Sequence, residues 1–164
     1  MNNMSIIVIL LILIAALFAG AFLSKRRFGL LGLGLAAGAI ISPIWGDTAG
    51  FVLSGTGLVK EGPLVNVIAL SALILIPPVL IMFHRGYSYK YIFGRIIGAL
   101  LFTLLAAAFL IGPIGAALSF SGPAAGVYNW LVANHELIVS VGVAIAVADL
   151  LIARPAHKTE RKHR

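Results

Sequence analysis

The sequence contains no cysteine, and only 10% of its residues are charged. A chain without cysteine forms no disulfide, holds no zinc through thiolates and has no cysteine nucleophile. A soluble domain has about 25% charged residues and about 50% apolar residues, but this chain is 61% hydrophobic with a mean hydropathy of +1.09. Because 164 residues are too few to bury so much apolar surface away from water, we expect a protein whose outward-facing side chains are solvated by lipid.

Motifs that carry catalytic or metal chemistry are also missing. The chain has no H-E-x-x-H, no Walker loop and no G-x-S-x-G, and the fragment VLSGTG at residues 52–57 lacks the first glycine of a serine elbow. The four histidines are far apart, in predicted loops or in the tail: His84, His135, His157 and His163. We therefore predict a protein that is not an enzyme and that has no catalytic residues, no metal site and no cofactor.

The sequence contains several long apolar stretches with few or no charged residues. A membrane-spanning helix needs roughly 20 mostly apolar residues, and five stretches meet this requirement: residues 5–23, 28–45, 64–83, 91–112 and 137–153. The predicted fold is therefore all-α, a polytopic membrane bundle of five transmembrane helices. It forms a single transmembrane domain over residues 1–153, followed by a basic cytoplasmic tail, residues 154–164. We expect Pro43 and Pro113 to end their helices, and residues 124–132 to form a short interfacial helix.

Lysine and arginine are distributed unevenly among the connections. Three follow the first span in "SKRRF", three lie within residues 84–95 and five lie in the tail, whereas residues 46–63 contain one and residues 113–136 none. Since cytoplasmic loops carry the excess of cations, the N-terminus is predicted outside and the C-terminus inside a plasma membrane, with a bacterial inner membrane favoured. The cations follow the first apolar run, so we expect an uncleaved anchor and not a signal peptide.

The net charge of +7 would raise the question of nucleic acid in a soluble protein. Here the cations lie at the predicted inner boundary of the bilayer. We expect Lys25, Arg26, Arg27 and the tail to contact anionic lipid headgroups, and we expect no nucleic acid partner.

Small residues at four-residue spacing predict close helix packing. The candidate positions are Ala16 and Gly20 in the first span, Gly34 and Gly38 in the second, and Gly94 and Gly98 in the fourth. Side chains of this size let helix backbones approach each other in lipid. Two interpretations are open: packing within this chain, or contact with a second copy or another membrane subunit.

Asp149 is the one acidic residue inside a predicted span, where an unpaired carboxylate is costly. A structural ion pair is one interpretation and a proton or ion relay is the other. Arginines from the same side are the expected partners: Arg26, Arg27, Arg85 or Arg95. Among the uncharged candidates, Asn66 is expected to bond to a neighbouring helix, and Pro77-Pro78 are expected to kink the third span.

Two basic segments that contain glycine open the second and fourth spans, as "SKRRFGLLGLGLAAG" and "YIFGRIIGALLFTLLAAAF". With RRFG and GRIIGALL in these places, residues 5–112 resemble the colicin V production protein family. These are small bacterial inner-membrane proteins usually described with four spans. The resemblance implies a role linked with export, envelope integrity or surface growth, without catalytic residues. This chain departs from the family because it lacks the acid before the fourth helix and has a fifth span.

Three classes of function remain as alternatives. The first is a non-enzymatic integral membrane scaffold or accessory subunit of an envelope-related or export-related assembly, which the packing motifs favour. The second is a small channel, a transporter component or a holin-like pore, motivated by the predicted kink, Asp149 and the small residues. The third is an intramembrane enzyme, which ranks last because no nucleophile and base occur at a recognised spacing.

Overall fold

The structure, a computed structural model, describes residues 3–57, 62–84, 89, 91–117 and 123–152. Within these ranges it contains helices and no strands, which confirms the all-α prediction. The helices are α1 (Asn3–Ser24), α2 (Phe28–Gly55), α3 (Pro63–Phe83), α4 (Ile92–Ala117), α5 (Pro123–Ala133) and α6 (His135–Ile152).

Four of the described helices are long and apolar enough to cross a membrane: α2, α3, α4 and α6. They coincide with the second to fifth predicted spans, so a membrane protein with several passes is supported. The helix α1 has 22 residues, and its part from Leu11 to Ser24 is a shorter apolar helix. That α1 crosses the membrane stays a prediction.

Two helices extend beyond their predicted ends. The helix α2 continues past residue 45 to Gly55, and α4 continues past residue 112 to Ala117. The prediction that Pro43 and Pro113 end their helices was therefore wrong, since both lie inside them. A proline removes one backbone donor, and neighbouring helices in a membrane protein can accommodate that loss. With 28 residues, α2 is about 42 Å long, which exceeds the hydrocarbon thickness of about 30 Å.

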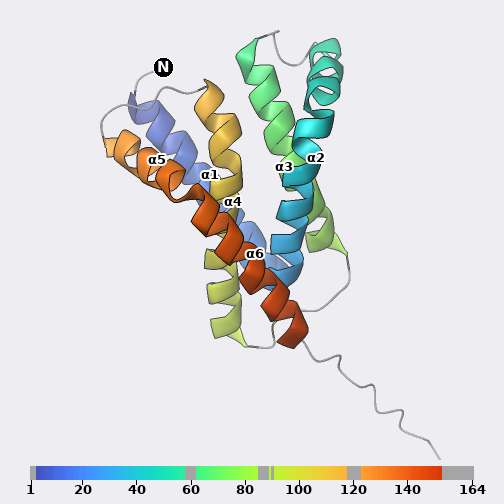
Figure 1. The fold of residues 1–164 in the computed structure, drawn as a ribbon, viewed down its shortest axis with the longest axis vertical. Coiled ribbons are helices and arrows are strands. Elements are labelled where there is room, and N and C mark those ends of the chain that lie inside the picture. Colours follow the sequence, from blue (N-terminus) through green and yellow to red (C-terminus); the bar gives the residue numbers. More distant parts are fainter. Residues whose placement is uncertain (1–2, 58–61, 85–88, 90, 118–122, 153–164) are drawn as a thin grey trace, which may run out of the picture.

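Successive long helices alternate in direction along the bundle (Figure 1). The helix α2 contacts α3, α4 and α6, while α1 packs mainly on α4. The turn after α1, the start of α4 and the last turn of α6 all lie at one end, which is the lower end in Figure 1. We call this the basic end. The start of α1 lies at the opposite end.

The contact between α2 and α3 is a seam of small residues on α2. Every fourth residue of α2 is small and buried here: Gly34, Gly38, Ser42, Gly46 and Gly50. Opposite them stand residues of α3 at the same spacing: Pro78, Ile74, Leu70 and Asn66. A Cβ added at Gly34 would lie 3.1 Å from the backbone of Pro78, so the two helix backbones are in close contact. Gly34 and Gly38 thus pack within the chain, the first of the two interpretations.

The apolar core lies where α2 and α4 meet, with contributions from α1, α3 and α6. Its largest fully buried side chains include Phe28, Leu31 and Leu35 from α2 and Phe102 and Leu105 from α4. On the outside, long apolar side chains remain exposed on every helix that could span the membrane. That distribution suits a chain whose solvent is lipid.

Candidate functional site

Several charged and polar side chains meet at the basic end, at the start of α2. The turn of residues 25–27 joins α1 to α2 and is so short that Lys25 takes a left-handed backbone conformation with φ of 57°. Its carbonyl accepts a hydrogen bond of 2.9 Å from the backbone N–H of Tyr89. The Arg26 guanidinium donates to the carbonyl of His84. The turn is therefore bound to His84, directly after α3, and to Tyr89, just before α4.

Asp149 brings the last turn of α6 to the same place. One of its carboxylate oxygens lies 3.1 Å from an Arg27 nitrogen, and the other accepts a hydrogen bond of 2.9 Å from the backbone N–H of Gly29. The two charged side chains are 15% and 20% exposed, so water reaches the pair only in part. The ion pair expected from the sequence is confirmed, and Arg27 is the partner. We call Arg27, Phe28, Gly29, Tyr89 and Asp149 the basic-end network.

The network also caps α2. The first N–H groups of a helix have no partner within it and prefer acceptors or negative charge. Arg27, the N-cap residue, provides no side-chain cap. Instead, the N–H of Phe28 donates to the Tyr89 hydroxyl at 3.1 Å, and the N–H of Gly29 donates to Asp149. Both acceptors come from segments more than 50 residues away, so capping of α2 depends on the assembled bundle.

Tyr89 connects the members of the network. Its hydroxyl donates to Asp149 at 3.4 Å, and the Arg27 guanidinium lies 5.5 Å from the centre of its ring. The ring rests on Gly94 and Gly98, where an added Cβ would come within 3.0 and 2.7 Å of it. These two glycines were predicted to pack helix against helix, but the surface they form in α4 receives a tyrosine ring.

Burial raises the pKa of the Tyr89 phenol above its ordinary value, and the charge of Asp149 acts in the same direction. The N–H of Phe28 and the charge of Arg27 lower that pKa in part. The phenol therefore stays protonated at neutral pH and remains a hydrogen-bond donor to the carboxylate.

A second arginine joins α1 to α4. The Arg95 guanidinium donates to the carbonyl of Phe22 at 2.8 Å and lies 4.4 Å from the centre of the Phe22 ring. A cation is favourable at the C-terminus of a helix, where carbonyls lack partners. Arg95 therefore caps the last turn of α1 from a neighbouring helix.

The other candidate residues lie outside the basic-end network. Gly20 faces the Met82 sulfur of α3, and an added Cβ would lie 3.8 Å from it, whereas Ala16 is exposed. The amide oxygen of Asn66 lies close to Gly50, 2.8 Å from where a Cβ would stand, so Asn66 does contact α2. Pro77 and Pro78 lie inside α3.

The cations of the turn differ in what they contact. Lys25 is exposed, while Arg27 is paired with Asp149. The tail and Arg85, to which the sequence also assigned roles, lie outside the described residues. Among the described cations of the turn, Lys25 is the one best placed to contact a lipid headgroup.

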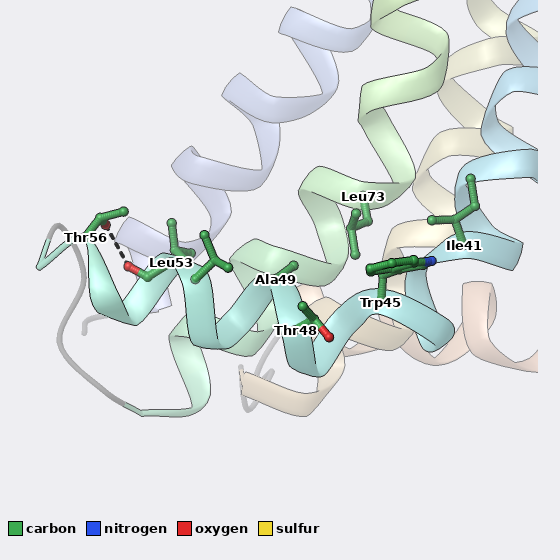
Figure 2. Close-up of a pocket in the computed structure, with 8 residues that line it drawn as sticks. Ile41, Trp45, Thr48, Ala49, Leu53, Thr56 and Leu73 are labelled. Atoms are coloured by element: carbon green, nitrogen blue, oxygen red, sulfur yellow. Dashed lines mark hydrogen bonds between the residues drawn. The ribbon is translucent and has the colours of Figure 1, made fainter.

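Toward the opposite end, one face of α2 is largely apolar. A groove of about 480 Å³ runs along its second half and ends against Leu73 of α3. Figure 2 shows Trp45 lying across this groove, with Ile41, Ala49 and Leu53 along the same face. The Thr56 hydroxyl donates to the carbonyl of Leu53 at 2.7 Å, so its proton is bound to the last turn of α2.

The side chains of the network are occupied by contacts with one another and with the backbone. Within the described ranges, no three His, Asp or Glu side chains come together as metal ligands. The carboxylate, the phenol and the guanidinium all bind one another or the start of α2. The arrangement can hold α2, α6 and the two connections in a fixed relation.

No model of a known protein family matches this chain, and no curated protein or solved structure matches it either. The resemblance of residues 5–112 to the colicin V production protein family therefore stays a prediction.

Proposed function

We propose that the protein is a non-enzymatic integral membrane scaffold or accessory subunit of an envelope-related or export-related assembly. The observation that carries this proposal is the use of Asp149, the one acidic residue in the predicted spans, in a contact between the chain's own helices. A carboxylate that binds Arg27 and caps α2 serves packing. A relay would need it to face a water-filled path.

The proposed topology has five spans, with the N-terminus outside and the basic end in the cytoplasm of a bacterial cell. Its support is that the cations of the turn after α1, Arg95 of α4 and the last turn of α6 lie at one end of the bundle. In this orientation Lys25 and the tail would face the anionic inner leaflet. The crossing of α1 is part of the proposal.

The topology can be tested without removing any native thiol, because the sequence has no cysteine. Single variants Lys25→Cys, Thr56→Cys and Asn129→Cys replace exposed residues at the two ends. In intact cells an impermeant maleimide should label Thr56→Cys and Asn129→Cys, and Lys25→Cys should react only after permeabilisation. Labelling of Lys25→Cys in intact cells would refute the proposed orientation.

The role as a subunit is tested by isolating the tagged protein in native lipid particles and measuring the mass of the assembly. We expect a defined complex, either with other membrane proteins or with a second copy. A protein that is strictly monomeric and brings down no partner would contradict the proposal.

The alternative, a small pore or transporter component, predicts a different result. Purified protein in liposomes would conduct ions, and Asp149→Asn would change the current. We expect liposomes that stay tight over a range of pH, because Asp149 is already bound to Arg27 and to the start of α2.

A further inference from the structure

Prolines inside α2 and α4 each leave one backbone carbonyl without its usual donor. In an α-helix the carbonyl of residue i accepts from the N–H of residue i+4, and proline has no N–H. Pro43 therefore releases the carbonyl of Ala39 in α2, and Pro113 releases the carbonyl of Phe109 in α4. In a membrane such an acceptor has no bulk water to bind.

Each of these two prolines lines the same cleft, together with the residue whose carbonyl it releases. The cleft has a volume of about 380 Å³ and lies between α2, α3 and α4, lined by Ala39, Ser42, Pro43, Leu70, Ile74, Phe109, Gly112 and Pro113. Residues four apart lie on the same helix face. Since Ala39 and Pro43 both line the cleft, the turn of backbone that carries the released carbonyl borders it. The same holds for Phe109 and Pro113.

The two prolines of α3 produce a different result. Pro77 releases the carbonyl of Leu73, and Leu73 does not line the cleft. Pro78 releases the carbonyl of Ile74, but Gly38 of α2 packs directly on that carbonyl. The backbone of α2 covers this acceptor, so the released carbonyls that can serve the cleft are those of Ala39 and Phe109.

Ser42 adds acceptor capacity on the same wall. Its hydroxyl donates to the carbonyl of Leu70 at 3.1 Å, so its proton is already used and its oxygen retains acceptor lone pairs. The residues that line the cleft include no charged side chain and no other side-chain donor. The cleft is thus largely apolar and presents acceptors of hydrogen bonds.

We propose that this cleft binds a membrane-soluble molecule with an apolar body and a single hydroxyl group, an aliphatic or aromatic alcohol. Its volume lies within the range of about 300–1,000 Å³ typical of small-molecule sites. A hydrocarbon chain would leave the two carbonyls without a donor, which costs free energy. A bare cation would enter low dielectric with no carboxylate in the lining to balance it.

The test uses two photoreactive probes in lipid nanodiscs, a fatty alcohol and its methyl ether, which differ in the presence of the donor. Labelled peptides are identified by mass spectrometry. One neutral hydrogen bond contributes about 0.5–1.5 kcal/mol, so the alcohol should label the cleft roughly 2- to 10-fold more than the ether. Equal labelling by the two probes would overturn the proposal.

Proline variants show whether the released carbonyls cause the preference. Pro43→Ala with Pro113→Ala restores both N–H groups and should reduce the ratio of alcohol to ether labelling to about one. Pro77→Ala is the matched control, because it makes the same change in α3 while neither Pro77 nor Leu73 lines the cleft. A preference that survives in the double variant, or that disappears in the control, would refute the assignment. Far-ultraviolet circular dichroism verifies that each variant keeps its helices.

Discussion

The two halves of the bundle are held together in different ways. In the half that contains the basic end, Asp149, Tyr89 and Arg95 each bond to a charged or backbone group of another element. Toward the other end, α2 and α3 meet through small residues, and clefts of about 380 and 480 Å³ lie along α2. Directional polar contacts are concentrated at the basic end, whereas the α2–α3 seam depends mainly on close packing, with one hydrogen bond from Ser42 to Leu70.

This difference follows from the solvent. Lipid tails are as apolar as leucine, so burying an apolar side chain between two helices adds little stability, and close packing or hydrogen bonding must hold the helices together. Where the chain approaches water it can use charge, and within the bilayer it uses small residues. Changes in side-chain volume should therefore destabilise the α2–α3 seam, and changes in charge should destabilise the basic end.

The largest effect is expected for Gly38→Leu. An added Cβ at this position would collide with the backbone of Ile74, and backbone cannot rotate away as a side chain can. We expect the free energy of unfolding in mixed micelles to fall by about 3 kcal/mol, at the upper end of the effect of overpacking.

Gly55→Leu is the matched control for this substitution. Gly55 ends the same helix, and an added Cβ there meets nothing within 4 Å. We expect its unfolding free energy to stay within about 0.5 kcal/mol of the parent. If the two variants were equally stable, α2 and α3 would not be in the close contact described here.

A smaller effect is expected for Asp149→Asn. The amide still accepts from the N–H of Gly29, but the Arg27 guanidinium loses its counter-charge. We expect a loss of about 2 kcal/mol in unfolding free energy, the scale for leaving a partly buried polar group unsatisfied. Asp47→Asn, at an exposed site in the other half, should change stability by less than about 0.5 kcal/mol.

A double-mutant cycle separates the ion pair from other effects of Asp149. Arg27→Gln and Asp149→Asn together should cost less than the sum of the single changes, with a coupling of about 1 kcal/mol. Simple additivity would mean that the two charges do not stabilise each other, and the basic end would then depend on fit as the other half does.

Much of the fold was predictable because composition and periodicity report directly on lipid exposure. The apolar runs located four helices long enough to span. The G-x-x-x-G step at Gly34 and Gly38 indicated a close-packed face on α2, and the structure identifies α3 as its partner. The need of an intramembrane carboxylate for a counter-charge indicated an arginine from the same side, which the structure identifies as Arg27.

The features that the sequence analysis predicted wrongly or did not predict share a physical cause. They depend on contacts between segments that are distant in the sequence. Pro43 was predicted to end its helix because proline disfavours helix locally. In the folded chain α2 packs against α3 and continues to Gly55. No role was predicted for Tyr89 from the sequence. Its role depends on Asp149, 60 residues away. The spacing of Gly94 and Gly98 gave no sign that a ring would fill the space.

The smallest effect is expected for Tyr89→Phe. The ring and its fit against Gly94 and Gly98 are retained, but the hydroxyl that accepts from Phe28 and donates to Asp149 is lost. If fit alone held the basic end, the variant would be as stable as the parent. We expect instead a loss of about 1 kcal/mol in unfolding free energy at pH 7, the usual contribution of a hydrogen bond.

The pH dependence of this loss gives the sharper test. Burial raises the pKa of Tyr89 in the folded protein above the value of about 10 expected in the unfolded chain. The folded state therefore holds the proton more tightly, and the resulting stabilisation is present below pH 10 and lost as pH rises through the folded pKa. The stability of the parent should fall faster than that of Tyr89→Phe in this alkaline range, when both are followed by unfolding in mixed micelles. Parallel curves would mean that the phenol is as free to ionise in the bundle as in the unfolded chain, which is incompatible with a hydroxyl held between α2 and α6.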